Sequence, residues 1–191
     1  IIKGLFMVIW GNKMDELIIR KAVETDIDEV EKIYNAVLDK EKDSGKVYTN
    51  WQKGLYPTRN DAVKAFEDGT LYVGEINGQV AACVNLNHIQ PEEYSKLNWS
   101  IKADGKEVLV IHTLCISPEF AGRKIGERFV AFTDKLASEL KCKTIRLDTY
   151  EGNIPAASLY KKMGYKYVGS EKFNFQNVIM ETLICFDKAV I

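Results

Sequence analysis

The sequence has few metal-binding side chains and no spacing that would gather them. Two histidines and four cysteines occur among its 191 residues, with no CxxC pair and no histidine at ligand spacing from a cysteine. This pattern argues against a structural zinc site and against the disulfide framework of a secreted domain. We expect no bound metal, a cytoplasmic location and buried, reduced cysteines. The cysteines are Cys83, Cys115, Cys142 and Cys185.

The sequence also lacks an excess of charge of either sign. Lysine and arginine number 26 against 27 aspartates and glutamates, which gives a formal net charge of -1. A balanced chain has no general attraction to nucleic acids or to membrane surfaces. The apolar segment 1–10 is too short to span a bilayer and has no cleavage site for secretion. We expect neither nucleic-acid nor membrane partners, so any anion site must be local.

The length and composition fit one globular domain. Apolar residues make up 46% of the chain and charged residues 28%, and 191 residues suffice for one well-packed core. Residues 1–13 have two interpretations: an upstream extension before a natural start at Met14, or a strand that docks on exposed apolar surface. We expect a single domain over residues 14–191.

The first half of the chain predicts strands and helices in alternation, followed by a hairpin. A strand over 17–20 precedes Thr25-Asp26-Ile27-Asp28, which is typical of a capping box at the start of a helix. A second capping box over 58–61 precedes a helix over 62–67. The dipeptide Asn77-Gly78 suits a type I′ turn between two antiparallel strands, because both turn positions need positive φ. The long polar stretch 88–106 predicts a functional loop or a piece of irregular helix.

The second half repeats a strand-then-helix unit twice. Val108–Ile116 is almost entirely apolar, as in a strand buried on both faces, and apolar residues then recur at helical spacing to residue 140. Thr144–Tyr150 is the next expected strand. The helix after it, 154–163, has Asn153 at its N-cap position. Successive strand-helix units make the two strands parallel neighbours.

The chain closes with two strands, 165–172 and 178–186, which a polar turn over 174–177 joins in antiparallel fashion. The complete pattern predicts the α/β class. We expect a mixed sheet of about six to seven strands, antiparallel at its ends with a parallel pair at the centre, and helices on both faces.

A short basic turn with two glycines joins the central strand to its helix. The run from Leu114 to Gly126 reads LCISPEFAGRKIG. The start of a helix presents free backbone N–H groups, and the helix dipole favours negative charge there. The expected ligand is therefore a phosphate. The alternative is a tight turn that binds nothing. The chain has no GxxxxGKS/T sequence, which excludes a nucleotide-hydrolysing P-loop.

Two stretches resemble the signatures of the GCN5-related N-acetyltransferase (GNAT) superfamily. Pro118, Phe120 and residues 121–126 are similar to its acetyl-CoA motif, in which Gln/Arg-x-x-Gly-x-Gly/Ala starts a helix. Residues 153–165, NIPAASLYKKMGY, match its second signature, Asn-x-x-Ala-x-x-Leu-Tyr-x-x-x-Gly-Phe/Tyr. The element order from residue 17 to residue 186 is also similar. The resemblance implies an acyl-CoA N-acyltransferase fold with a splayed central strand pair, and transfer from acetyl-CoA to a primary amine through a tetrahedral intermediate.

The resemblance also implies which residues contact acetyl-CoA. Ala121 stands where the motif usually has Gln or Arg, and Lys124 stands where it has its first glycine. A glycine there lets the backbone approach the pyrophosphate, so Lys124 either crowds the site or adds a positive charge. The implied cofactor contacts are Leu114, Cys115, Ile116, Ala121, Gly122, Arg123, Lys124, Ile125, Gly126, Asn153 and Tyr160.

Acetyl transfer needs one group that takes a proton from the amine and another that protonates the leaving thiolate. Tyr160 matches the superfamily's general-acid position, and a phenol with an ordinary pKa of about 10 stays protonated at neutral pH. His112, on the strand that leads to the acetyl site, is the candidate base. It alternatively orients the acceptor or is a satisfied core histidine. Glu107 and Glu75 are weaker candidates for the base.

The superfamily builds its acceptor pocket from the early loops and from the segment before the fourth strand. Trp51, Tyr56 and Trp99 stand there, and they either line the pocket or anchor their own loops. We expect the acceptor to be a small molecule or an amino-acid-like compound. The alternatives are a protein N-terminus, as for ribosomal-protein acetylases, and an acyl-CoA-binding sensor without turnover. Superfamily members often pair through late strands, which allows a homodimer.

Overall fold

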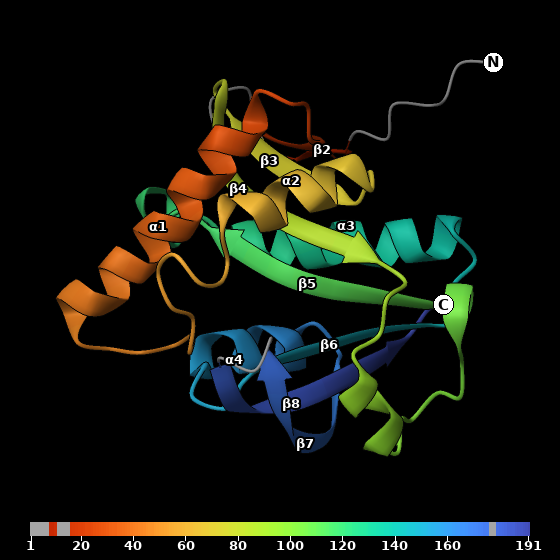
Figure 1. Ribbon diagram of the computed structural model, residues 1–191. Coiled ribbons are helices and arrows are strands. Elements are labelled where there is room, and N and C mark those ends of the chain that lie inside the picture. Colours follow the sequence, from red (N-terminus) through yellow and green to blue (C-terminus); the bar gives the residue numbers. More distant parts are fainter. Residues whose placement is uncertain (1–7, 11–15, 176–178) are drawn as a thin grey trace.

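The computed structural model describes residues 8–10, 16–175 and 179–191, which form one sheet with helices on both faces (Figure 1). The sheet has eight strands in the order β1-β2-β3-β4-β5-β6-β8-β7, one more than the upper end of the predicted range. The strands are β1 (Val8–Trp10), β2 (Leu17–Lys21), β3 (Leu71–Ile76), β4 (Gln79–Asn87), β5 (Val108–Ile116), β6 (Thr144–Tyr150), β7 (Lys166–Phe175) and β8 (Ile179–Ala189).

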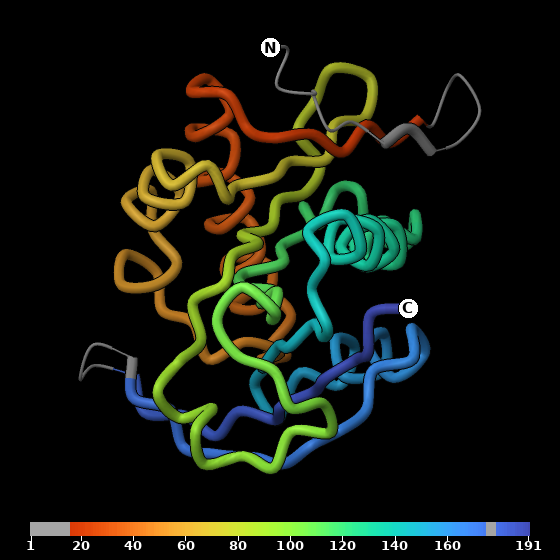
Figure 2. The backbone as a smooth tube through the Cα atoms, turned by 90° about the vertical axis from the view of Figure 1, so that its right-hand side faces the viewer, coloured from red at the N-terminus to blue at the C-terminus, as the bar shows by residue number. Residues whose placement is uncertain are grey.

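The helices divide between the two faces of the sheet. Figure 2 shows α1 and α2 on one side of the strands, and α3 and α4 on the other. Apolar side chains of α3 and α4 pack on one face in the largest core cluster, and those of α1 and α2 pack on the opposite face in a second cluster. The helices are α1 (Asp26–Ser44), α2 (Arg59–Glu67), α3 (Ile125–Glu139) and α4 (Ile154–Lys162), with short 3-10 helices η1 (Glu92–Lys96), η2 (Gly105–Glu107) and η3 (Pro118–Phe120).

The predicted parallel pair at the centre of the sheet is confirmed. Strands β5 and β6 pair over only four residues each, from Val108 opposite Thr144 to Ile111 opposite Leu147. Both strands continue beyond this ladder, to Ile116 and Tyr150, without pairing with each other. All the other strand pairs are antiparallel. The central strands therefore splay apart, and each has an unpaired edge beyond the ladder.

A bulge in β5 lies at the point where the strands separate. Between β4 and β5, Cys83 pairs with Cys115 but Asn85 pairs with His112, so β5 has one more residue than β4 over this interval. Thr113 has a φ of 51°, in the left-handed region. Ile111 and Leu114, three residues apart, consequently pack in the same core cluster. The bulge exchanges the faces of the sheet for the rest of the strand.

Of the three predicted turn and capping motifs, two are confirmed and one is wrong. The hairpin is confirmed, because Asn77 and Gly78 have φ values of 51° and 78° between β3 and β4. The capping box of Thr58 and Asp61 is also present, and α2 starts directly after it. The capping box predicted at Thr25 is wrong, because its side chain makes no cap hydrogen bond.

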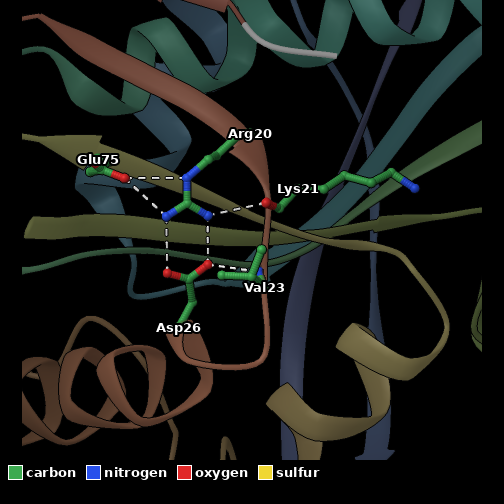
Figure 3. A network of polar contacts seen from close by, with 5 residues as sticks. All are labelled: Arg20, Lys21, Val23, Asp26 and Glu75. Carbon is green, nitrogen blue, oxygen red and sulfur yellow. Dashed lines mark hydrogen bonds and ion pairs between the residues drawn. The ribbon is translucent and has the colours of Figure 1, made fainter. Parts of the chain in front are cut away.

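The Thr25 backbone is already helical, with a φ of -67° and a ψ of -15°, and its neighbour Asp26 makes the polar contacts at the start of α1. The Asp26 carboxylate accepts hydrogen bonds from the Val23 N–H at 2.8 Å and from Arg20, with a closest nitrogen-oxygen distance of 2.6 Å (Figure 3). The same guanidinium contacts Glu75 on β3 at 3.0 Å. Asp26 therefore ties the start of α1 to β2.

Two predicted regions lie partly outside the described residues. In the N-terminal segment 1–13, Val8–Trp10 forms β1, which pairs with β2 in antiparallel register, whereas Met14 is outside the description. In the predicted turn over 174–177, residues 176 and 177 are outside it as well, between Phe175 and Ile179, which pair across the hairpin. In the stretch 88–106, the irregular helix is present as η1.

The four cysteines are all free and buried, as expected. Within the described ranges, no three His, Cys, Asp or Glu side chains come together in a way that could hold a metal ion. No helix in that part of the chain combines the length and the apolar character needed to cross a bilayer.

Candidate active site

The turn between β5 and α3 presents free backbone donors. Over the described residues, the N–H groups of Gly122, Lys124, Ile125 and Gly126 make no main-chain hydrogen bond. Gly122 has a φ of 80°, and a Cβ added there would meet nothing within 4 Å, so the turn borders open space. Free donors at a helix start, next to open space, suit a phosphate group. Four of the six predicted turn residues, Ala121 and Arg123 excepted, therefore present N–H groups free of main-chain bonds to described residues.

Lys124 adopts the backbone conformation that the usual glycine would adopt. Its φ of 57° is left-handed, and it occupies the N-cap position of α3. A residue with a Cβ is strained there by about 1 kcal/mol relative to glycine. Lys124 thus costs conformational free energy relative to glycine, and it places a positive charge on the turn where a negative group is expected. Two other turn residues make contacts within the protein: the Ala121 N–H bonds to Pro118 O, and Arg123 stacks on the Phe120 ring.

Gly126 lets α3 approach both α4 and β5. A Cβ at this position would lie 2.9 Å from Leu159 Cδ2 and 3.2 Å from Ile116 Cδ1. The first distance is shorter than van der Waals contact allows, so a larger residue would push the helices apart. Gly126 thereby fixes the turn relative to α4, which carries the second signature.

The open edge of β5 offers two more donors. Ser117 N–H bonds to Ala81 O at 2.8 Å, and Cys115 pairs with Cys83, so both face β4. Consecutive N–H groups of a strand point to opposite edges. The N–H groups of Leu114 and Ile116 therefore point to the edge of β5 that no longer pairs with β6. The Cys115 side chain is buried on the α1 side, and burial raises the pKa of its thiol well above the ordinary value.

Tyr160 projects from α4 into the interior at the splay. It is 5% exposed and packs against Tyr165 and Phe186 with ring-centroid distances of 5.6 and 6.3 Å. Its hydroxyl makes no hydrogen bond to any described residue. Burial raises the pKa of this phenol, and the charge of Asp148 raises it further. Tyr160 is thus a protonated donor without a hydrogen-bond partner among the described residues.

Asn153 has the predicted cap role. Its Oδ1 accepts a hydrogen bond from Ala156 N–H at 3.1 Å at the start of α4. No described residue accepts a hydrogen bond from its amide nitrogen. The side chain can therefore cap the helix and donate to a ligand at the same time.

His112 lines a small cavity of about 190 Å³ between α2 and the ends of β4 and β5. Its Nε2 lies 3.1 Å from both Asn87 Oδ1 and Ile89 O. Two acceptors at one nitrogen assign the ring proton to Nε2 and leave Nδ1 with a free lone pair. Burial lowers the pKa of His112 to about 4, against a smaller opposing effect of the Ile89 carbonyl. The imidazole is consequently neutral and weakly basic.

The three predicted acceptor aromatics do not lie together. Tyr56 lines the same cavity as His112, its hydroxyl is 2.7 Å from Thr113 Oγ1, and Trp51 packs edge-on against it at 5.9 Å. Trp99 instead borders a second cavity of about 560 Å³. There it donates to Tyr94 O at 2.9 Å and stacks on Arg146 at 4.4 Å.

The alternative carboxylates have other partners. Glu107 pairs with Lys143 at 2.6 Å on the surface, and Glu75 belongs to the Arg20 network. Neither borders the cavity that contains His112.

The structure adds two acidic residues that sequence reasoning missed. Asp148 is the first residue of β6 after the parallel ladder, and its Oδ2 accepts a 2.7 Å hydrogen bond from Tyr94. Glu181 is a buried residue on β8. Burial raises the pKa of Asp148 to about 6 and that of Glu181 to about 7. Asp148 lies inside β6, after Arg146 and Leu147, and no sequence pattern singled out either acidic residue.

Residues 30–165 match the family model described as "Acetyltransferase (GNAT) family". The uncharacterized N-acetyltransferase YesJ of Bacillus subtilis is 28% identical over 113 residues, which cover 59% of this chain and 61% of that protein. Spermine/spermidine N(1)-acetyltransferase of the same species is 33% identical over 69 residues, 36% of this chain and 45% of that protein. The chain therefore spans less than two thirds of these curated relatives.

A solved structure covers the whole fold. A GNAT-family acetyltransferase from Streptococcus agalactiae superposes with a TM-score of 0.75 and 25% sequence identity, over 97% of this chain and 98% of that one.

Proposed function

Because the chain belongs to the acetyltransferase (GNAT) family, we propose that it is an N-acetyltransferase that transfers the acetyl group of acetyl-CoA to the primary amine of a small molecule. The observation that carries this proposal is the splayed pair of β5 and β6, with free donors on β5 and an unpartnered Tyr160 beside it. The spermine/spermidine acetyltransferase among the relatives supports a small amine as the acceptor.

The residues of the turn fit a cofactor with a pyrophosphate. Gly122, Lys124, Ile125 and Gly126 offer free N–H groups, and Asn153 offers an amide donor on the facing helix. When bound, acetyl-CoA supplies the thioester whose acetyl group goes to the amine. The Leu114 and Ile116 N–H groups point to the open edge of β5, where it splays from β6. They are suited to stabilise negative charge on the thioester oxygen.

Tyr160 is the proposed proton donor to the departing sulfur. Its raised pKa keeps the phenol protonated, and no described residue forms a hydrogen bond with its hydroxyl. A thiol is more acidic than a phenol, so a hydrogen bond from Tyr160 stabilises the thiolate before the proton is transferred.

The amine must lose a proton before or during the attack. We assign this proton to Asp148, directly or through a water molecule, because a pKa of about 6 makes it a better acceptor near neutral pH than His112, with a pKa of about 4. His112, the base predicted from the sequence, then orients the acceptor from the cavity that it shares with Tyr56. Trp51 and Trp99 support the loops that carry the pocket.

The test is acetylation of a panel of amines by the purified chain. Incubation with acetyl-CoA, small primary amines and peptides with a free N-terminus is followed by mass spectrometry and by release of free CoA. We expect acetylated small amines and stoichiometric CoA. Acetylation of the peptides alone would transfer the assignment to protein N-termini. Tight binding of CoA without product would identify a sensor and overturn the proposal.

A further inference from the structure

Asp148 and Glu181 carry carboxylates that no cation among the described residues neutralises. Glu181 is 8% exposed, and Asp148 is partly buried behind Tyr94. Neither forms an ion pair with a described residue, and no lysine, arginine or histidine contributes to the electrostatic environment of either group. Their contacts are neutral: the Tyr94 hydroxyl on Asp148 and the Asn50 side chain on Glu181.

Charges buried in proteins are normally paired, because removing them from water is costly. The charge that acts on Glu181 is another negative one, that of Asp148. The two carboxylates create a negative potential that no cation of the described residues cancels. A positive group of a ligand can supply the missing partner.

The pair extends outward from the acetyl-transfer position. Asp148 lies where β6 leaves β5, and its charge reaches the Tyr160 hydroxyl on one side and Tyr56 on the other. The Tyr160 side chain is 5% exposed and its hydroxyl makes no hydrogen bond to a described residue, which leaves it free to donate to a ligand. Glu181 lies further along the same face of the sheet, where Asn50 of the α1–α2 loop meets it.

The residues between the two carboxylates are apolar. On β8, Leu183 and Cys185 share the buried face with Glu181, and Phe173 is directly opposite Glu181 on β7. No third metal-binding side chain joins the pair within the described part of the chain. Apolar residues between two carboxylates favour an organic cation with methylene groups over a metal ion.

We propose that Asp148 and Glu181 form a two-point cation subsite, and that the acceptor is a diamine or polyamine. The reacting amine lies at Asp148 next to Tyr160, and a second ammonium group is held by Glu181. This inference rests on the proposed function, because it names the substrate class of the same site. It makes Glu181 a specificity-determining residue that lies away from the reacting atoms.

Steady-state kinetics with matched amines test the subsite. The probes are 1,4-diaminobutane and spermidine against n-butylamine, which has the same reacting end as the diamine but no second charge. We expect kcat/KM of the wild type to be at least about tenfold higher for the diamine, and this ratio to fall about tenfold in Glu181→Gln, mainly through KM. Glu181→Asp, which keeps the charge, restores part of the ratio.

The matched control is Glu151→Gln. It removes the same charge from an exposed side chain whose backbone N–H bonds to Thr182 O, next to Glu181. We expect it to keep the wild-type ratio. Equal efficiency of the wild type toward n-butylamine and the diamine, or an unchanged ratio in Glu181→Gln, would overturn the subsite while acetyl transfer itself stands.

A binding measurement separates this inference from the proposed function. Spermidine is titrated by calorimetry into the wild type and into Glu181→Gln, each saturated with CoA, so that no turnover is needed. At least about tenfold weaker binding in the variant supports the subsite even if no amine is acetylated. Equal affinities would refute it even if the enzyme proves active.

Discussion

The Tyr94 hydroxyl donates a 2.7 Å hydrogen bond to Asp148 Oδ2, although the two residues are 54 positions apart in the sequence. Tyr94 belongs to η1 and is almost completely buried, and Asp148 is the first residue of β6 beyond the parallel ladder. The bond fixes one carboxylate oxygen and leaves Oδ1 without a hydrogen bond to any described residue. One oxygen of the carboxylate is therefore held, and the other keeps its lone pairs for the ammonium group proposed above.

The buried charge of Asp148 should cost folding free energy. Its pKa of about 6 in the folded protein exceeds the ordinary value of 3.8, so the folded state binds the proton more tightly than the unfolded chain. Stability then falls as pH rises from about 4 to 6, and the full cost is present above that range. We expect Asp148→Asn to raise the free energy of unfolding by on the order of 2 kcal/mol at pH 8, and by nothing below about pH 4.

Urea unfolding of the wild type and Asp148→Asn at several pH values measures this difference. Asp43→Asn, at an exposed position of α1, is the control and should stay within about 0.5 kcal/mol of the wild type. A loss of stability in Asp148→Asn at pH 8 would show that the carboxylate is stabilised rather than strained by its surroundings.

The same residue should set the acid limb of the rate profile. We expect kcat/KM for an amine to fall below about pH 6 in the wild type, because the Asp148 carboxylate must be ionised to receive the ammonium and its proton. His112→Gln should keep the midpoint of this limb, since a pKa of about 4 leaves the imidazole neutral throughout. Asp148→Asn should remove the limb. Comparing variants with one amine cancels the titration of the substrate. A limb that disappears in His112→Gln would reassign the base to His112.

Tyr160→Phe removes a hydroxyl but no packing, because the ring contacts with Tyr165 and Phe186 remain. Loss of a proton donor to the leaving group should lower kcat about 100-fold, within the usual range for general acid catalysis. The dissociation constant for CoA should change less than about threefold, since the pyrophosphate contacts lie on the turn. Calorimetry and steady-state kinetics measure the two quantities. Unchanged kcat would exclude Tyr160 from proton transfer.

Lys124 combines backbone strain with a positive charge, and three variants separate them. Lys124→Gly relieves the left-handed conformation and should stabilise the protein by about 1 kcal/mol, whereas Lys124→Gln keeps the strain. Both remove the charge and should weaken CoA binding severalfold, more at low salt than at high salt. Lys124→Arg keeps the charge and serves as the control. Equal CoA affinity in all three would mean that the lysine is tolerated but does not contact the phosphates.

The hydrogen bond between Tyr56 and Thr113 connects the α1–α2 loop to the bulge of β5. A double-mutant cycle with Tyr56→Phe and Thr113→Val isolates its contribution. We expect a coupling free energy of about 1 kcal/mol in urea unfolding, the usual net contribution of a buried hydrogen bond. Strictly additive effects of the two substitutions would show that the loop and the bulge are energetically independent.

Periodicity and turn chemistry in the sequence were enough to predict the order of elements. Asn77-Gly78, Thr58 with Asp61, and the parallel pair of β5 and β6 all depend on contacts close in sequence or on connection rules, and each was confirmed. The Thr25 capping box was wrong, because the Thr25 backbone is already helical and its neighbour Asp26 makes the polar contacts at the start of α1. One of these contacts is the ion pair with Arg20 of β2, which no local pattern indicates.

The candidate site was partly predictable, for the same reason. The cofactor turn and Tyr160 lie within two contiguous signatures, and the sequence contains them whole. Glu181 and Asp148 come together only through the pairing of β8 with β6, and their importance depends on burial and on the lack of a cation partner. Neither property can be read from one sequence. Trp99 shows the opposite case, because its position in the chain suggested the acceptor pocket, whereas its side chain packs on Arg146 in another cavity.

Because of the extra residue at Thr113, the number of residues in β5 decides which side chains face each side of the sheet. Counted along the strand, odd positions face α3 up to Ile111, and even positions face α3 from Leu114 onward. Loss or gain of one residue between Ile111 and Leu114 would exchange the side chains that look toward α3 with those that look toward α1, and it would also turn the free N–H groups toward β4. A single substitution in this strand changes one side chain. An insertion or deletion there would redirect both the side chains and the free N–H groups of the site.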